Sequence, residues 1–78
     1  MKYNIKLTKR VIKIISKTLN IDIKDLSESS SSQNIKKWDS LAHIRIILLI
    51  EKNFKIKINT SQQAKLNSVK SIISYLSK

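Results

Sequence analysis

The residues of this sequence whose types and spacing best suit chemistry are a serine and the carboxylate before it, in the segment Asp39-Ser40-Leu41. Trp38 precedes this segment and the most apolar stretch of the chain follows it, so Ser40 stands where a helix is expected to begin. Another enzyme could reach a hydroxyl in that position and attach a group to it. The spacing therefore predicts a modification site. The alternative is that Asp39 and Ser40 only open the helix, because both residue types are common at helix starts.

Nucleophilic catalysis by this serine is a further interpretation, and the sequence argues against it. A catalytic serine needs a base and a group that orients the base. His43 is the single histidine and follows three residues later on the same expected helix, where a partly exposed side chain is the simpler interpretation. No oxyanion hole or enclosed cleft can be read from the sequence. We therefore predict that the protein is not an enzyme.

The composition excludes several other kinds of site. The 78 residues contain no cysteine and no glycine. Thiolate chemistry, cysteine metal sites and glycine-rich phosphate loops are therefore excluded, and we predict no metal centre. A chain of this length forms one domain, which we expect to cover residues 1–78.

Residues 7–19 have the apolar periodicity of an amphipathic helix. Thr8 is a candidate N-cap if this helix starts late, and Asn20 is a candidate terminator in place of the missing glycine. Residues 20–37 are predicted to form a long loop. We expect the tip of the serine-rich part, residues 27–33, to be mobile. The apolar residues expected to anchor the loop on the core are Ile21, Ile23 and Leu26.

Residues 39–54 form the strongest predicted helix, with Asp39 as its N-cap. Its apolar side chains cover a wide arc, which indicates that the helix is packed on more than one side. The arc consists of Leu41, Ile44, Ile47, Leu48, Ile50 and Phe54. The narrower outer stripe consists of Ala42, Arg45, Leu49, Lys52 and Asn53.

Residues 54–58 alternate apolar residues with lysine, and we expect an extended loop there. Pairing of this segment with residues 3–7 as a two-stranded sheet is the alternative. A capping-box pattern at Thr60 predicts a short helix to about residue 66. A last helix is then capped by Asn67 or Ser68, and its apolar face consists of Val69, Ile72, Ile73 and Leu76. The predicted fold class is all-α, with three main helices and one short one around an aliphatic core.

The segment Trp38-Asp39-Ser40-Leu41-Ala42-His43-Ile44, followed by Leu48, Glu51, Phe54 and Ile58, resembles the acyl carrier protein family. The resemblance covers almost the whole chain and includes its length, the first amphipathic helix, the long loop, the short third helix and the last helix. It implies a four-helix bundle of acyl-carrier type. It also implies that Ser40 carries a covalent phosphopantetheine arm whose thiol holds an acyl or aminoacyl group as a thioester.

The resemblance further implies which residues assist the arm and its partner enzymes. Asp39 and Leu41 flank the attachment site, and Asp39 helps to place Ser40 for a phosphopantetheinyl transferase that uses coenzyme A and a divalent metal. Leu41 and Ile44 are expected to link the site to the core. The expected partner-binding residues are Trp38, Ala42, Arg45, Leu48, Leu49 and Lys52. For Trp38 the alternative is that it fastens the loop to the helix.

The formal net charge of +11 departs from the family, whose members are typically acidic. Ile35-Lys36-Lys37-Trp38 also replaces the usual Leu-Gly before the motif. Because complementary charge steers pairing, we expect poor pairing with the partners of an acidic carrier. With Trp38 directly before Asp39-Ser40-Leu41, the chain resembles stand-alone carriers of specialised pathways, such as secondary metabolism or surface-polysaccharide assembly. The expected partners are an acyl- or aminoacyl-loading ligase and downstream transferases.

A small basic helical protein that binds nucleic acid or an anionic membrane, without a prosthetic group, is the rival interpretation. The charge supports it, but the lysines are dispersed and no recognition motif for nucleic acid is present. The longest apolar run, residues 46–50, is too short to span a bilayer. No secretory signal is visible after Met1. We expect a monomeric cytoplasmic protein that neither binds nucleic acid nor inserts stably into membranes.

Overall fold

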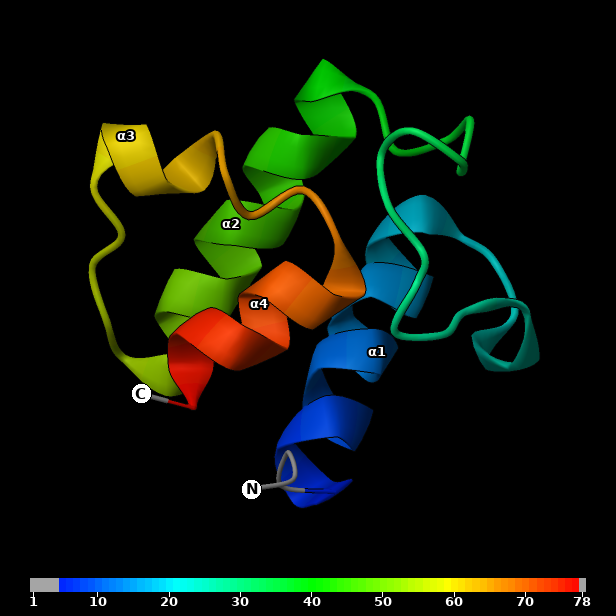
Figure 1. The fold of residues 1–78 in the computed structure, drawn as a ribbon, viewed down its shortest axis with the longest axis horizontal. Helices are drawn as coiled ribbons and strands as arrows, with labels where there is room; N and C mark the ends of the chain where they lie inside the picture. The colour runs from blue at the N-terminus through cyan, green and yellow to red at the C-terminus, as the bar shows by residue number, and fades with distance from the viewer. Residues whose placement is uncertain (1–4, 78) are drawn as a thin grey trace.

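The computed structural model describes residues 5–77 as an all-α fold (Figure 1). The predicted fold class is confirmed. The elements, in chain order, are α1 (Ile5–Leu19), the 3₁₀ turn η1 (Ile23–Asp25), α2 (Ser40–Phe54), α3 (Thr60–Gln63) and α4 (Val69–Leu76). α1 packs against both α2 and α4. None of the helices within the described range is long and apolar enough to cross a membrane.

α1 begins at Ile5, two residues before the predicted start, so the proposal that Thr8 caps it is wrong. Its end is where the sequence placed it. Asn20 has a φ of 57°, the left-handed conformation that ends a helix and that glycine usually supplies. The amide of Ile21 then donates a hydrogen bond to the Ser16 carbonyl at 3.1 Å. Asparagine thus closes the helix in a chain that has no glycine.

α2 begins at Ser40 with Asp39 as its N-cap, as predicted, and ends at Phe54, followed by the C-cap residue Lys55 with a φ of 54°. The prediction that its wide apolar arc is packed on more than one side is wrong. Leu41, Ile44 and Leu48 are 59%, 54% and 59% exposed. Ile46, Ile47 and Ile50 are the buried residues of this helix. Only one side of α2 therefore faces the core, and its opposite side presents apolar groups to solvent.

The chain between α2 and α4 follows the predicted order. Residues 56–59 have no regular secondary structure, and no strand forms within residues 5–77. Of the alternative pairing, residues 5–7 are helical and residues 3–4 lie outside the described range. The N-cap of α3 is Asn59, one residue before the predicted Thr60, and its side chain accepts from the Gln62 amide at 2.9 Å. α3 ends at Gln63, earlier than the predicted residue 66. Ser68 caps α4 in a reciprocal capping box with Ser71.

The loop between α1 and α2 is fastened to the bundle more firmly than its composition suggested. Leu26 is buried and Ile21 is half-buried, as predicted, but Ile23 is 52% exposed. The amide of Ser32 donates to the Asn67 carbonyl at 2.9 Å, and the Val69 amide donates to the Ser30 carbonyl at 2.9 Å. These bonds hold the serine-rich segment against the start of α4, which argues against the predicted mobile tip.

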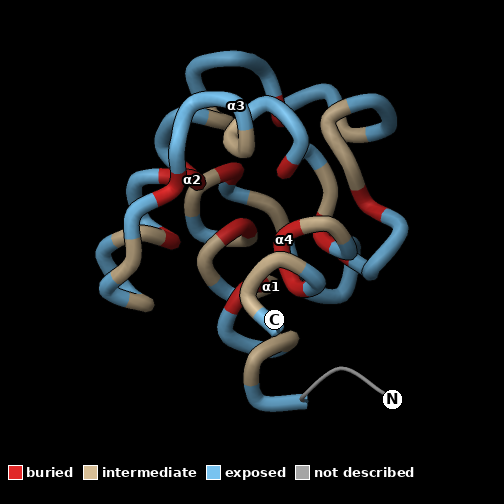
Figure 2. Tube along the Cα trace, turned by 60° about the vertical axis from the view of Figure 1, so that its left-hand side comes forward, coloured by how far each residue is buried: buried red, intermediate tan, exposed pale blue. Residues whose placement is uncertain are grey.

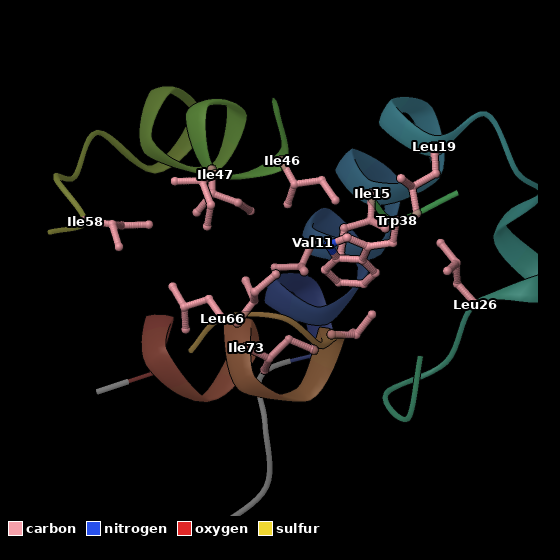
Figure 3. Close-up of a cluster of buried hydrophobic side chains, with 13 residues drawn as sticks. Val11, Ile15, Leu19, Leu26, Trp38, Ile46, Ile47, Ile58, Leu66 and Ile73 are labelled. Atoms are coloured by element: carbon pink, nitrogen blue, oxygen red, sulfur yellow. The ribbon is translucent and has the colours of Figure 1, made fainter. Parts of the chain in front are cut away.

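The core lies between α1, α2 and α4, and burial alternates along each helix so that one side faces inward (Figure 2). Figure 3 shows the indole of Trp38 within the cluster of aliphatic side chains. Burying a valine or isoleucine of this kind contributes about 1.5–3 kcal/mol. The fully buried aliphatic residues are Val11, Ile15, Ile46, Ile50, Val69, Ile72 and Ile73.

Candidate functional site

Ser40 is the first residue of α2 and its side chain is exposed. The Asp39 carboxylate accepts a hydrogen bond from the Ala42 amide at 2.9 Å, and the His43 amide donates to the Asp39 carbonyl at 2.8 Å. Asp39 therefore fixes the first turn and with it the position of the Ser40 hydroxyl. The hydroxyl is open to a second macromolecule.

The start of α2 also retains free hydrogen-bond donors. Within residues 5–77, the amides of Ser40 and Leu41 have no protein acceptor. Such free N–H groups, together with the helix dipole, favour an anion at this end of a helix. A phosphate ester on Ser40 fits this local structure, because these two amides are donors available to an anion.

A shallow hollow of about 590 Å³ lies beside Ser40, between α2, α3 and the preceding loop. Its lining combines polar groups with apolar ones, which suits a flexible chain that contains both amides and methyl groups. The lining residues are Ser32, Trp38, Asp39, Ser40, His43, Ile44, Thr60, Gln63, Ala64 and Asn67. The residues present therefore fit a phosphopantetheine arm attached at Ser40.

Trp38 and His43 are two of the residues that line this hollow. The Trp38 indole is 2% exposed, and its Nε1–H donates to Nδ1 of His43 at 3.1 Å. Nε2 of His43 lies 2.8 Å from the Gln63 carbonyl oxygen, so Nε2 carries the proton and donates. Both ring nitrogens are thus engaged, and His43 is not placed to act as a base on Ser40. This bridge could not be predicted from local sequence patterns, because Gln63 lies twenty residues further along the chain.

The expected partner-binding residues differ in burial. Trp38 is buried in the core, which agrees with the alternative that it fastens the loop to the helix. Ala42 is half-buried, whereas Arg45, Leu48, Leu49 and Lys52 are exposed. The expectation that Leu41 and Ile44 link the site to the core is wrong, since both are exposed on the same side of α2 as Leu48.

Glu51 faces away from the solvent side of α2. Its Oε2 accepts a hydrogen bond from the buried Ile58 amide at 2.8 Å, and its carbonyl accepts from Ile56 at 3.1 Å. This carboxylate therefore fixes the loop after α2. The solvent-facing side of α2 beyond Asp39 carries Arg45 and Lys52 and no carboxylate. No group of three or more potential metal ligands occurs within the described part of the chain.

A helical bundle that exposes a capped serine at the start of its second long helix has the architecture of a phosphopantetheine carrier. The family model described as "Phosphopantetheine attachment site" matches residues 9–76. An acyl carrier protein of Buchnera aphidicola subsp. Schizaphis graminum is 37% identical over 68 residues, which cover 87% of this chain and 86% of that protein. The chain belongs to the acyl carrier protein family. Members of this family are carriers and not enzymes, and they bear a covalently attached phosphopantetheine group.

Proposed function

We propose that Ser40 is the attachment site of the phosphopantetheine arm. The observation that supports this most strongly is its exposed hydroxyl at the first position of α2, beside two amides that have no acceptor among residues 5–77. Asp39 places the hydroxyl by capping the helix. The modifying enzyme is a phosphopantetheinyl transferase that uses coenzyme A and a divalent metal. When bound, the arm supplies the thiol that this cysteine-free chain lacks.

The partner face of the carrier is the exposed side of α2, defined here as Leu41, Ile44, Arg45, Leu48, Leu49 and Lys52, with the half-buried Ala42 at its edge. An apolar centre beside charged groups is the usual composition of a protein interface. Leu41 and Ile44 join the originally expected residues because their exposure makes them available to a partner. Trp38 is left out because it is buried.

The basic partner face supports a dedicated pathway. Arg45 and Lys52 would repel the basic surfaces that bind acidic carriers. We propose a monomeric carrier of acyl or aminoacyl groups in a specialised biosynthetic pathway, served by its own loading ligase and downstream transferases. Its proposed location is the cytoplasm, where coenzyme A for the modification is available.

Intact-mass measurement tests the attachment site. After incubation with a broad-specificity phosphopantetheinyl transferase and coenzyme A, the protein should gain the mass of one arm, and Ser40→Ala should gain none. Ser61→Ala is the matched control, because Ser61 is another exposed serine in the first turn of a helix, and it should be modified like the wild type. A wild-type protein without the gain, or a gain that persists in Ser40→Ala, would refute the assignment.

A further inference from the structure

A continuous groove runs between α1 and α2, on the surface beside the partner face. It consists of two adjoining hollows that share Lys17 and Leu49. One extends to Arg10 and Asn53, and the other extends to Arg45. The pairing of Arg10 with Asn53 at one end and of Thr18 with Arg45 at the other shows that α1 and α2 run in opposite directions, as Figure 1 also shows.

The groove has basic rims and an apolar floor. Arg10, Lys13 and Lys17 line it from α1 at positions i, i+3 and i+7, which place them on one face of that helix. Arg45 lines it from α2. The floor is apolar and consists of Ile14, Leu48 and Leu49. The groove thus combines a row of cations with a contiguous apolar surface.

Among the described residues, no acidic side chain lines this groove. The five acids of the sequence are Asp22, Asp25, Glu28, Asp39 and Glu51. Three lie in the loop between α1 and α2, Asp39 caps α2, and Glu51 is bound to the Ile58 amide. Within residues 5–77, no carboxylate pairs with Lys13, Lys17 or Arg45. The positive charge of the rims is therefore available to a partner.

Arg10 is held in place before any partner arrives. Its guanidinium carbon lies 4.2 Å from the centroid of the Phe54 ring, and its Nη2 donates to the Asn53 carbonyl at 3.2 Å. A guanidinium that is already fixed loses little conformational entropy when it binds a carboxylate. This end of the groove is therefore organised for a carboxylate in a defined position.

We propose that the α1–α2 groove is a docking site for an acidic amphipathic helix of a partner protein. From Arg10 to Lys17 the row of cations extends about 10 Å, or two helical turns. A partner helix with carboxylates at i, i+3 or i+4, and i+7 matches this row, while its apolar side chains contact the floor. The partner therefore binds along α1 as well as along α2, and the α1 contact does not depend on modification of Ser40.

A protein helix fits this groove better than an anionic membrane does. Ile14 is half-buried and lies between the basic rims. A flat lipid surface would contact the cations and the exposed Leu48 and Leu49 but would not reach Ile14, whereas the side chains of a helix can enter the groove. The concave shape and the fixed Arg10 therefore favour a protein partner.

Titration of the ¹⁵N-labelled full-length protein, with and without the arm, tests the proposal by NMR. The probe is a three-turn stapled helical peptide with glutamates at i, i+3 and i+7 beside leucines. The peptide should shift the amide resonances of Lys13, Lys17 and Leu49. A peptide with glutamine in place of glutamate should bind about tenfold more weakly, since three exposed ion pairs are lost.

Matched variants locate the binding site. Lys13→Glu with Lys17→Glu should weaken binding of the acidic peptide about tenfold or more. Lys24→Glu with Lys70→Glu makes the same change of charge at exposed positions outside the groove and should have little effect. Equal binding of the two peptides, or equal losses in the two double variants, would overturn the proposal.

Phosphatidylglycerol vesicles and duplex DNA serve as competing probes. If either binds and shifts the groove amides while the acidic peptide does not, the groove is a site for lipid or nucleic acid and the proposal fails. Failure of this test leaves the Ser40 assignment intact, because the intact-mass measurement reads that site independently.

Discussion

The Trp38 indole N–H donates to Nδ1 of His43 at 3.1 Å, and this contact joins the loop before α2 to the first turn of the helix. The planes of the two rings are inclined by 27°, with centroids 6.3 Å apart. Since Nε2 of His43 donates to the Gln63 carbonyl at 2.8 Å, the same histidine also holds the end of α3. One side chain thus fixes three segments around the hollow beside Ser40.

We expect His43→Ala to destabilise the fold by about 1–3 kcal/mol, because the buried Trp38 N–H loses its acceptor. Urea unfolding followed by circular dichroism measures this change. In a double-mutant cycle with Trp38→Phe, which removes the N–H and keeps an aromatic ring, the coupling energy should be about 0.5–1.5 kcal/mol. Additive effects of the two substitutions would show that the hydrogen bond contributes nothing to stability.

Asp39 is predicted to stabilise α2 through its capping hydrogen bond to Ala42. Asp39→Ala should cost about 0.5–2 kcal/mol in the free energy of unfolding, whereas Asp39→Asn keeps a side-chain acceptor and should cost much less. The rate of arm transfer should fall in Asp39→Ala, because the position of Ser40 is less well fixed. An unchanged rate in Asp39→Ala would limit the role of Asp39 to helix stability.

Glu51 is expected to stabilise the fold as a hydrogen-bond acceptor and not to contact a partner protein. Glu51→Ala leaves the buried Ile58 amide without its partner at 2.8 Å and should cost about 1–3 kcal/mol. Glu51→Gln retains an acceptor oxygen and should lie between Ala and the wild type in urea unfolding. If both variants keep wild-type stability and lose partner binding instead, the acid belongs to the interface.

Local sequence signals predicted the helix ends well. Asp39, Ser68 and Asn20 act where the sequence placed them, because capping depends on the residue itself and on amides within one turn. The proposed cap at Thr8 was wrong because α1 continues past it toward the N-terminus. Local sequence signals thus predicted most helix boundaries to within one or two residues of those in the structure.

The exposed face of α2 could not be predicted from periodicity. A wide apolar arc shows that a helix carries a large apolar surface. It does not show whether the core of the same chain or another protein buries that surface. Leu41 and Ile44 were expected to link the site to the core and are exposed. The contact from His43 to Gln63 was missed for a related reason, since only the tertiary fold brings α3 to α2.

Arg45 and Lys52 are expected to govern the choice of partner enzyme. Both are exposed on α2, within about three helical turns of Ser40. Reversal of both charges to glutamate should slow loading by the cognate ligase and should change the salt dependence of the loading rate, because attraction to an acidic partner surface becomes repulsion. Loading rates at low and high ionic strength measure the effect.

Stability and a matched variant separate partner choice from a general effect of charge. The free energy of unfolding of the Arg45→Glu, Lys52→Glu double variant should stay within about 0.5 kcal/mol of the wild type, since both side chains are exposed. Lys24→Glu with Lys70→Glu changes the net charge by the same amount at exposed positions away from α2 and should leave loading almost unchanged. If the ligase loads the Arg45→Glu, Lys52→Glu variant at the wild-type rate at low salt, these two side chains face solvent and do not contact the ligase. Because Arg45 also lines the α1–α2 groove, a loss of loading that Lys13→Glu with Lys17→Glu reproduces would extend the partner's contact from α2 onto α1.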